Sequence, residues 1–334
     1  MLTNILTLIV AFLITILAIP FVKKIAKYYN AYDHPNYRKN HKGKVPLMGG
    51  IAIFVGTIAG LVFGYDYSNI YHTLIICGAF SMLVLGVVDD KIDMGAKAKF
   101  LLPLLASLTI ISAGVRMLSV QIYVLSVLLT VVWVVGLTNA FNYIDGMDGL
   151  ALTVAILCSL SFVVIYSFSG NQSGLILALA ILGASIAFLI QNKKPAKIFL
   201  GDSGSMLLGF LLASLPLIGL WRSATMSFTY LIIPPIIFAF PILDAFLVTF
   251  LRIVHKQRPW LPDLNHSFHR LLRAGLTYGK TFFLIITFVF LSQLIALSLL
   301  FFKNLTIFLV VLFVITLFLI FKKMDSFKVN SYAK

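Results

Sequence analysis

The sequence predicts an all-α polytopic integral membrane protein in which residues 1–334 form a single transmembrane domain. Hydrophobic residues make up 60% of the chain and charged residues only 11%, whereas soluble domains carry about 25% charged residues. Apolar runs of about 20 residues, the length that crosses a bilayer, recur along the whole chain. Lys and Arg are concentrated in alternate links between these runs, which is typical of a chain that crosses the membrane repeatedly.

Eleven apolar runs are candidate spans. In chain order they cover residues 3–22, 46–64, 72–88, 100–115, 118–137, 149–168, 173–191, 204–221, 228–251, 281–301 and 304–321. The first run has no basic residue before it and no cleavage site of small residues, so we expect a retained helix rather than a signal peptide. Three prolines predict a kink in the run 228–251. The last two runs carry almost no polar side chains, so we expect them to pack against lipid.

The basic residues predict the orientation of the chain. All but three of the 26 Lys and Arg fall on one side of the expected membrane, and the exceptions are Arg116, Arg222 and Lys303. The positive-inside rule then puts the N-terminus outside and the C-terminus in the cytoplasm. The net charge of +15 therefore reflects topology and attraction to anionic membrane lipids, and nucleic acid is not an expected partner. The cytoplasmic segments are 23–45, 89–99, 138–149, 192–203 and 252–280, with a tail at 322–334.

The acidic residues and the cysteines narrow the chemistry. The chain has eleven Asp and no Glu, and all the Asp except Asp66 fall on the expected cytoplasmic side. Short, stiff carboxylates on one face indicate ligands positioned close to helix ends. Cys77 and Cys158 both lie inside predicted spans, so we expect packing residues rather than a disulfide or a zinc site.

The stretch NAFNYIDGMDGL, Asn139–Leu150, is the densest group of polar residues between two apolar runs. Asn139, Asn142, Asp145 and Asp148 supply amide and carboxylate oxygens, the ligands that hard cations such as Mg²⁺ prefer. Polar groups at this density beside a bilayer are costly unless they face a cavity, a metal or water. The alternative is an ordinary turn between two membrane helices.

The run 72–88 leads into VVDDKID, where Asp89 and Asp90 are adjacent and Asp93 follows. Neighbouring carboxylates repel each other, so at least one is expected to have a raised pKa or a cation beside it, which suits a general base or a metal-linked carboxylate. Lys97 and Lys99 follow closely enough to hold a phosphate. A solvated helix end is the alternative.

In FLGDSGS, Asp202 lies between glycines directly before an apolar run. A helix N-terminus of this composition is a ready anion site, and Asp202 is suited to bridging the anion through Mg²⁺. Phe199, just before it, is suited to stacking a base. An N-cap role for Asp202 is the alternative.

Asp244 lies deep in an apolar run, and an intramembrane Asp is by default functional or paired. Arg252, two turns on, is a candidate partner. His266 and His269 are three residues apart and share one face of a helix if the segment is helical. With Arg270 beside them and no Cys or Glu nearby, contact with phosphate is more plausible than a zinc site.

The segments VVDDKID, NAFNYIDGMDGL, FLGDSGS and PDLNHSFHR stand in this order on the expected cytoplasmic side. From about residue 30 to about residue 280 the chain resembles the polyprenyl-phosphate N-acetylhexosamine-1-phosphate transferases of glycosyltransferase family 4. The resemblance is strongest to the bacterial subgroup that transfers GlcNAc-1-phosphate to undecaprenyl phosphate, whose first cytoplasmic loop is similar to DHPNYRKNHKGKVPLMGG. This sequence departs from the family's HxHHR motif, because Phe268 replaces the middle histidine. The change concerns the identity of the sugar nucleotide more than the type of reaction.

The resemblance implies that UDP-GlcNAc and undecaprenyl phosphate meet at the cytoplasmic face of a bacterial inner membrane, and that UMP leaves when the lipid phosphate attacks the β-phosphorus. By motif position it assigns Asp202 and Asn142 to Mg²⁺, or Mn²⁺ in its place, and Asp89 or Asp90 with Asp202 to catalysis. Phosphoryl transfer needs such cation neutralisation and positioning. The residues implied in substrate binding are Lys99, Asn139, Asp145, Asp148, Phe199, His266, His269 and Arg270.

Other functions stay open at this point. An ion-coupled transporter would use Asp244, Asp89 and Asp90 as coupling sites, but the carboxylates gather on one face and no inverted repeat is visible. A passive lipid-binding or assembly subunit would not need four acidic clusters. Within the transferase interpretation, another UDP-N-acetyl sugar is the alternative donor, the product initiates a cell-surface glycan, and a homodimer is left open.

Overall fold

The computed structural model describes residues 2–33, 43–92, 94–112, 114–222, 228–258 and 264–302, leaving aside the side chains of 96–98 and 228. The predicted run 304–321 and the tail 322–334 lie outside the described residues. Several polar residues of the segments quoted above also lie outside the described residues: Arg38, Lys39, His41, Asp93, Asp263 and the side chain of Lys97.

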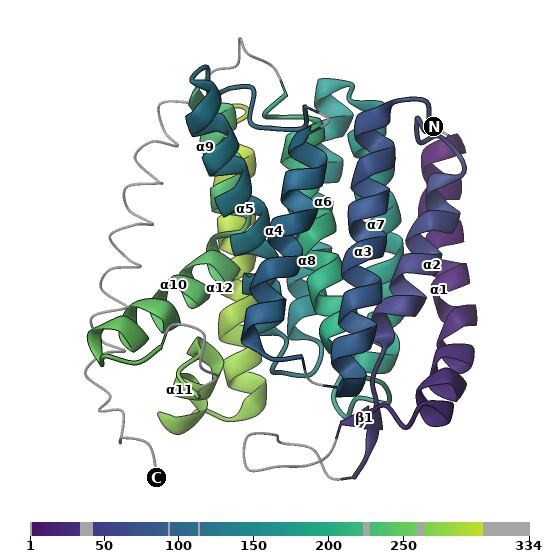
Figure 1. The fold of residues 1–334 in the computed structure, drawn as a ribbon, viewed down its shortest axis with the longest axis vertical. Coiled ribbons are helices and arrows are strands. Elements are labelled where there is room, and N and C mark those ends of the chain that lie inside the picture. Colours follow the sequence, from purple (N-terminus) through teal and green to yellow (C-terminus); the bar gives the residue numbers. More distant parts are fainter. Residues whose placement is uncertain are drawn as a thin grey trace.

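The described chain is a bundle of helices with one short antiparallel ladder (Figure 1). Each of the first ten predicted runs overlaps a helix, and the run 228–251 overlaps two. The elements are α1 (Leu2–Tyr28), β1 (Tyr32–Asp33), β2 (Val45–Pro46), α2 (Gly49–Leu61), α3 (Ile70–Ile92), α4 (Ala96–Ser112), α5 (Tyr123–Ile144), α6 (Leu150–Ser169), α7 (Gln172–Asn192), α8 (Gly201–Ile218), α9 (Phe228–Ile237), α10 (Ala239–Val254), α11 (Ser267–Arg273) and α12 (Tyr278–Ser298).

The helices make this a multi-pass membrane protein. In the described part of the chain, α1, α3, α5, α6, α7, α8 and α12 are long and apolar enough to cross a bilayer, and α9 with α10 makes an eighth span if the bent pair is counted as one. The runs predicted at 46–64 and 100–115 form the shorter helices α2 and α4. At 13 residues, α2 is about 20 Å long, less than the hydrocarbon core of a bilayer of about 30 Å.

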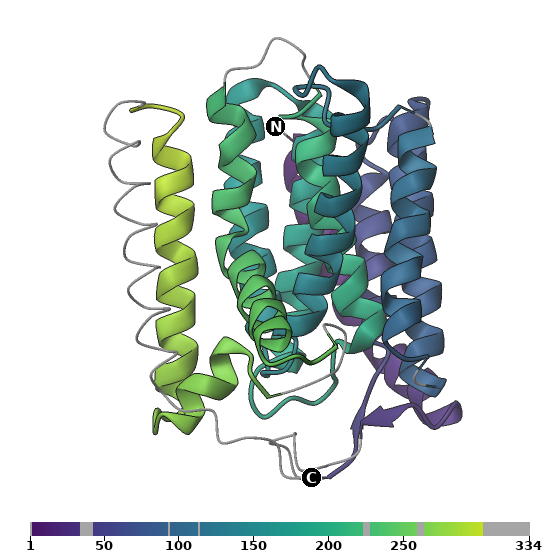
Figure 2. The same ribbon diagram turned by 60° about the vertical axis from the view of Figure 1, so that its left-hand side comes forward.

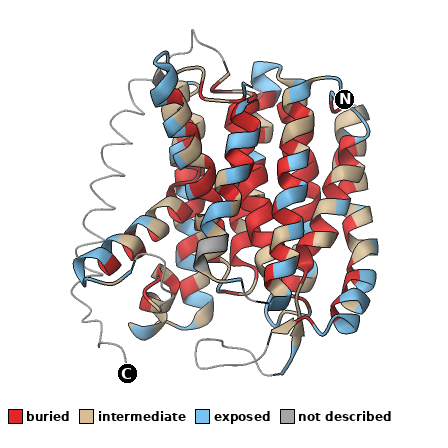
Figure 3. Cartoon of the chain, in the orientation of Figure 1, coloured by how far each residue is buried: buried red, intermediate tan, exposed pale blue. Residues whose placement is uncertain are grey.

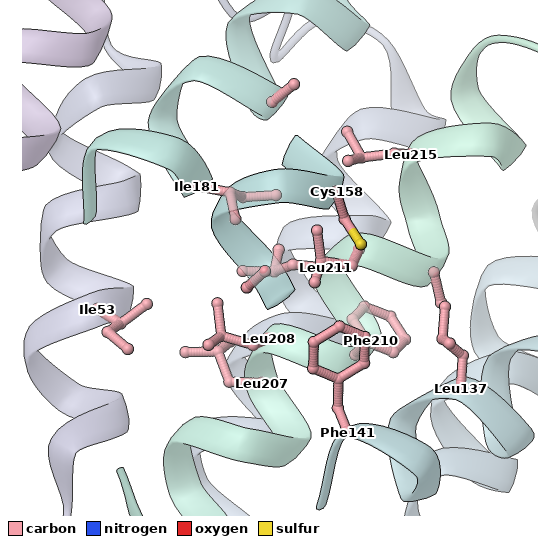
Figure 4. Close-up of a cluster of buried hydrophobic side chains, with 14 of the residues drawn as sticks. Ile53, Leu137, Phe141, Cys158, Ile181, Leu207, Leu208, Phe210, Leu211 and Leu215 are labelled. Carbon is pink, nitrogen blue, oxygen red and sulfur yellow. The ribbon is translucent and has the colours of Figure 1, made fainter. Parts of the chain in front are cut away.

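The centre of the bundle is α8, whose residues from Ser203 to Ile218 are all buried. Figure 4 shows its side chains among those of α2, α5, α6 and α7, and Figure 3 shows burial falling off toward the outer helices. The crossing with α3 is close because Gly86 has no side chain: a Cβ there would lie 2.3 Å from the Cα of Ser203. This contact fixes the end of α3, with its two aspartates, beside the start of α8.

The links that carry the predicted motifs meet at one end of the bundle, the lower end in Figures 1 and 2, where β1 and α11 lie and from which the N-terminus is distant. Hydrogen bonds join these segments there: Gly149, before α6, to Asn192 at the end of α7, and Phe199 in the α7–α8 link to Pro46 of β2. We call this the site end. The described parts of the predicted cytoplasmic segments thus lie at one end of the bundle.

The span 228–251 is broken as its prolines predict: α9 and α10 meet at Phe238 with a bend of 71°. Pro234 has no N–H to donate to the carbonyl of Tyr230, four residues earlier. Trp221 Nε1 donates to that carbonyl instead, at 3.1 Å. Beyond the break, α10 runs obliquely across the site end (Figure 1).

The cysteines differ in their surroundings. Cys158 is fully buried, as expected of a packing residue, but Cys77 is exposed on α3, so a core packing role for it is wrong. Neither forms a disulfide. The expectation of lipid packing for the run 281–301 is also incomplete, because Gln293 of α12 is only 4% exposed.

Candidate active site

Asp202, in the first turn of α8, is the point at which the ends of α3, α4, α5 and α8 meet. Lys99 at the start of α4 contacts its Oδ2, and Asn142 in the last turn of α5 donates from Nδ2 to its Oδ1 at 2.6 Å. Lys99 Nζ also lies 2.9 Å from Oδ2 of Asp89, at the end of α3. One ammonium group therefore bridges two carboxylates. We call Asp89, Asp90, Lys99, Asn142 and Asp202 the Asp202 cluster.

The adjacent carboxylates Asp89 and Asp90 have different partners. Asp90 accepts hydrogen bonds from the backbone amides of Asp202 at 2.7 Å and Ser203 at 3.4 Å, so it caps the N-terminus of α8 from another helix. Gly201, with φ +69°, makes room for it: a Cβ there would lie 2.5 Å from Asp90 Oδ2. Asp89 faces Lys99 and is held by the amide of Met94 at 2.7 Å. The capping role considered for Asp202 thus belongs to Asp90.

The donor set of the Asp202 cluster fits a hard divalent cation. Among the residues that the structure describes, no three His, Cys, Asp or Glu side chains are grouped so as to hold a metal by themselves. Asp89 and Asp202 supply carboxylates and Asn142 an amide, while Mg²⁺ commonly takes one or two carboxylates and completes its shell with water and substrate phosphate. A cationic group, Lys99 Nζ, already lies between the carboxylates.

The two amides of α5 have different contacts. Asn142 donates both to Asp202 and to Ser205 Oγ, at 2.9 Å, which sequence analysis did not single out. Asn139, one turn earlier, donates to the carbonyl of Val135 within its own helix at 2.9 Å. The structure thus joins Asn142 to the Asp202 cluster, whereas the donor of Asn139 stays within α5.

Asp145 and Asp148 lie in the turn that follows α5. Burial raises the pKa of the Asp145 carboxyl well above its usual range, and the negative charges of Asp202 and Asp90 raise this pKa further. Asp148 turns the other way, because its Oδ2 accepts from the amide of Ala196 at 3.2 Å. The Asp145 carboxyl group therefore lies near the carboxylates of Asp202 and Asp90 at the site end. Asp148 instead binds the backbone of the link between α7 and α8.

Asn192, which sequence analysis missed, joins two motif segments. Its buried side chain accepts from the amide of Gly149 at 3.0 Å and donates to the carbonyl of Ile198 at 2.9 Å. Phe199, next along, donates its backbone N–H to the carbonyl of Pro46 at 2.9 Å, and its ring is half-buried. The only sequence signal for Asn192 was an amide at the end of an apolar run.

A second group of residues reaches the site end from α10 and α11. His266 Nδ1 donates to Oδ2 of Asp244 at 2.8 Å, and the amide of Ser267 donates to Oδ1 at 2.6 Å. The intramembrane Asp244 is thus paired, and its partner is a histidine that sequence analysis had not matched to it. The guanidinium of Arg252, the partner considered earlier, lies 5.7 Å from the ring centroid of Tyr143. A direct Asp244–Arg252 pair stays a prediction.

Phe268 joins α11 to the turn after α5. A Cβ on Gly146 would lie 2.5 Å from the Cζ of Phe268, so ring and backbone are in contact. His269 lies against the same ring, with centroids 4.1 Å apart, and Arg270 is buried. Tyr143, next to Asn142, lies 5.4 Å from the His266 ring. The following residues are called the His266 cluster: Asp244, His266, Phe268, His269 and Arg270.

Comparison with known proteins gives a consistent assignment. A family model described as glycosyl transferase family 4 matches residues 72–220, which include Asp89, Lys99, Asn142 and Asp202. A Bacillus subtilis protein named "Probable undecaprenyl-phosphate N-acetylglucosaminyl 1-phosphate transferase" is 38% identical over 328 residues, 94% of this chain and 90% of the relative.

Two further relatives carry related names. The Escherichia coli "Undecaprenyl-phosphate alpha-N-acetylglucosaminyl 1-phosphate transferase" is 30% identical over 296 residues, 83% of this chain and 79% of the relative. The Mycobacterium tuberculosis "Decaprenyl-phosphate N-acetylglucosaminephosphotransferase" is 29% identical over 332 residues, 88% of this chain and 81% of the relative. Because the similarity extends over almost the whole length of this chain and of the Bacillus subtilis protein, the chain belongs to glycosyl transferase family 4.

Proposed function

We propose that this protein transfers GlcNAc-1-phosphate from UDP-GlcNAc to undecaprenyl phosphate, as the initiating step of a cell-surface glycan. A phosphate oxygen of the lipid forms a bond to the β-phosphorus, the bond between that phosphorus and the bridging oxygen breaks, and UMP leaves with the oxygen. The names of the relatives support the reaction type. They also favour a transferase over an ion-coupled transporter.

The observation that carries the proposal is the bridge that Lys99 makes between Asp89 and Asp202. Phosphoryl transfer depends on placing cations around phosphate oxygens and holding the reactants in line. A lysine held between carboxylates at a helix N-terminus is oriented for that task. When diphosphate arrives, Lys99 is available to exchange a carboxylate for a phosphate oxygen.

We assign separate tasks to the carboxylates. Asp89 orients or deprotonates the lipid phosphate, because its Oδ2 lies against the lysine rather than against backbone. Asp90 keeps Asp202 in place, because both its oxygens accept from the amides at the start of α8. Asp202 and Asn142 hold Mg²⁺, or Mn²⁺ in its place, with Asp202 acting directly in catalysis. The bound cation supplies neutralisation of the charge on the diphosphate.

The remaining predicted residues line the donor. Asp145, Asp148, Asn139 and Phe199 are assigned to the nucleotide, with the Phe199 ring as a stacking surface. His266, His269 and Arg270 are assigned to the sugar phosphates. His266 Nδ1 is occupied by Asp244, which leaves Nε2 as the ring nitrogen for a ligand.

The location follows from charge. Lys193, Lys194 and Lys197 lie in the α7–α8 link at the site end, whereas Arg116 and Arg222 line a small cavity beside Tyr71 near the other end of the helices. The positive-inside rule then supports a cytoplasmic site in a bacterial inner membrane, with the N-terminus outside and the C-terminus inside. The long isoprenoid chain of the acceptor gives the reason for a membrane enzyme.

The sugar is tested by substrate choice. Purified protein in detergent, with undecaprenyl phosphate and Mg²⁺, is offered UDP-GlcNAc and, separately, other UDP-N-acetyl sugars, and the lipid diphosphate-sugar is identified by mass spectrometry. We expect product with UDP-GlcNAc. Product only with another sugar would keep the reaction and point to Phe268, which packs against Gly146 where the family has a histidine. Folded protein that forms no product with any of them would contradict the proposal.

A further inference from the structure

Pro241 leaves one carbonyl without its helical donor at the break between α9 and α10. In a regular helix the N–H of residue 241 would donate to the carbonyl of Ile237, four residues earlier, but proline has no N–H. The helical pattern holds on either side, since Phe238 donates to Pro234 at 3.0 Å and Ile242 to Phe238 at 3.1 Å. The Ile237 carbonyl is therefore the acceptor that must find a donor elsewhere.

Gln293 of α12 supplies that donor. Its Nε2 donates to the Ile237 carbonyl at 2.9 Å, and Ser161 Oγ of α6 donates to its Oε1 at 2.7 Å, which orients the amide. The Cys158 thiol reaches the same carbonyl at 3.5 Å. Gln293 is 4% exposed, Ser161 2% and Cys158 fully buried. Leaving a carbonyl unpaired at membrane depth is costly, so this network stabilises the bent arrangement over a straight one.

The bend sets the direction of α10, and α10 carries Asp244, the residue that holds His266 and the first amide of α11. We propose that Gln293 is a positioning residue: by holding the Ile237 carbonyl it fixes the bend, and through α10 it fixes where His266 lies. The effect of Gln293 on the position of His266 is inferred only from the contacts given above. Its consequence for donor binding rests on the proposed function.

The placement is tested without any substrate, by labelling histidines with diethyl pyrocarbonate and mass spectrometry. His266 is 8% exposed and His72, near the other end of α3, is 5% exposed, so His72 reports general loosening of the same protein. We expect Gln293→Leu to raise the labelling of His266 about fivefold while His72 stays unchanged, since the opening is local. Ser214→Ala is the control, because this buried hydroxyl bonds only within α8, to the carbonyl of Phe210.

Equal labelling of His266 in Gln293→Leu and in the unmodified protein would overturn the inference, and so would a rise shared equally by His72. If Gln293→Leu does not fold, Ser161→Ala removes the bond that orients the amide, together with a contact of 3.2 Å to the carbonyl of Leu157 within α6. We then expect about a twofold rise at His266 alone, and no rise would overturn the inference in the same way.

Kinetics then separates this inference from the proposed function. We expect Gln293→Leu and Asp244→Asn each to raise the KM for UDP-GlcNAc about tenfold, with the KM for undecaprenyl phosphate unchanged. The double variant is expected to be no worse than Asp244→Asn alone, because both changes act on one chain of contacts. Fully additive effects would overturn the inference. An absence of UMP from the unmodified protein would instead contradict the proposed function and leave the labelling result standing.

Discussion

Around Asp202, four helix ends meet directly, whereas His266 reaches the same end of the bundle through a bent helix and a single carboxylate. In the Asp202 cluster, Lys99 of α4 and Asn142 of α5 contact Asp202 directly, and Asp90 of α3 caps the amides at the start of α8. In the His266 cluster, position depends on Asp244 and on the break at Phe238. The difference suggests a rigid part for the chemistry and a separately held part for the donor.

The largest effect is expected at Asp202. Asp202→Asn keeps the shape but removes the charge that faces Lys99, so turnover should fall by about 10³-fold or more. The variant should stay folded, as judged by size-exclusion chromatography. Asp66→Asn, an exposed residue outside this cluster, is the matched control and should keep full activity. Near-normal turnover of Asp202→Asn would remove Asp202 from the reaction centre.

Lys99→Gln should lower turnover by about 10²-fold, because the bridge between Asp89 and Asp202 loses its charge. Turnover is to be measured at saturating concentrations of both substrates, so that kcat is read separately from KM. A change confined to KM would place Lys99 with the donor-binding half instead and would weaken the comparison between the two clusters.

His266→Ala should act mainly on donor binding. We expect the KM for UDP-GlcNAc to rise about tenfold, with a smaller change in kcat, since Asp244 of α10, and not a residue of the Asp202 cluster, holds the Nδ1 of His266. The comparison is sharpened if Lys99→Gln and His266→Ala affect different constants. It fails if both variants lower kcat alone.

Asp145→Asn should stabilise the protein in EDTA while lowering its activity. The pKa of the Asp145 carboxyl is raised in the folded state, so the folded protein binds this proton more tightly than the unfolded chain does. Stability is then lost as the pH rises from the unfolded pKa of about 3.9 toward the folded value. We expect the variant to melt a few degrees higher at pH 8, with the difference shrinking at pH 4. Equal melting temperatures of the variant and the unmodified protein at pH 8 would contradict the claim that the ionised Asp145 carboxylate destabilises the folded state.

The smallest effect is expected from Cys77→Ser combined with Cys158→Ser. Cys77 is exposed, and a serine at 158 retains a donor for the Ile237 carbonyl. Activity should stay within about twofold of the unmodified protein, since surface changes and conserved hydrogen bonds cost little. Loss of activity by a folded double variant would give the cysteines a role that this account lacks.

Local patterns in the sequence were sufficient to predict the helices and the kink. Apolar runs predict the spans because every side of a membrane helix must be buried in protein or face lipid. The prolines predict a kink within 228–251, and the structure places it at Phe238. The apolar runs overestimate the number of long spans, because α2 and α4 are apolar but short. Apolarity alone does not measure where a helix ends.

The sequence predicts which residues form the site, but not how they pair with one another. The clustering of Asp202 with Asp89, Lys99 and Asn142 could be expected from their place at span ends on one side. That Asp90 caps α8, and that Asp244 pairs with His266, depends on how distant helices are aligned along one another, which no local pattern contains. Gln293 was passed over because an amide in an apolar run predicts no role until the Ile237 carbonyl, left without its helical donor by Pro241, is known to lie against it.

The most direct test follows UMP release by the purified protein as a function of free Mg²⁺, with undecaprenyl phosphate present or absent. We predict release that requires the lipid, rises with Mg²⁺ and stops in EDTA, since the Asp202 cluster is proposed to act with a bound divalent cation. Turnover that continues in EDTA, or UMP release that does not need the lipid, would contradict the central claim that this cluster carries out phosphoryl transfer to a membrane acceptor.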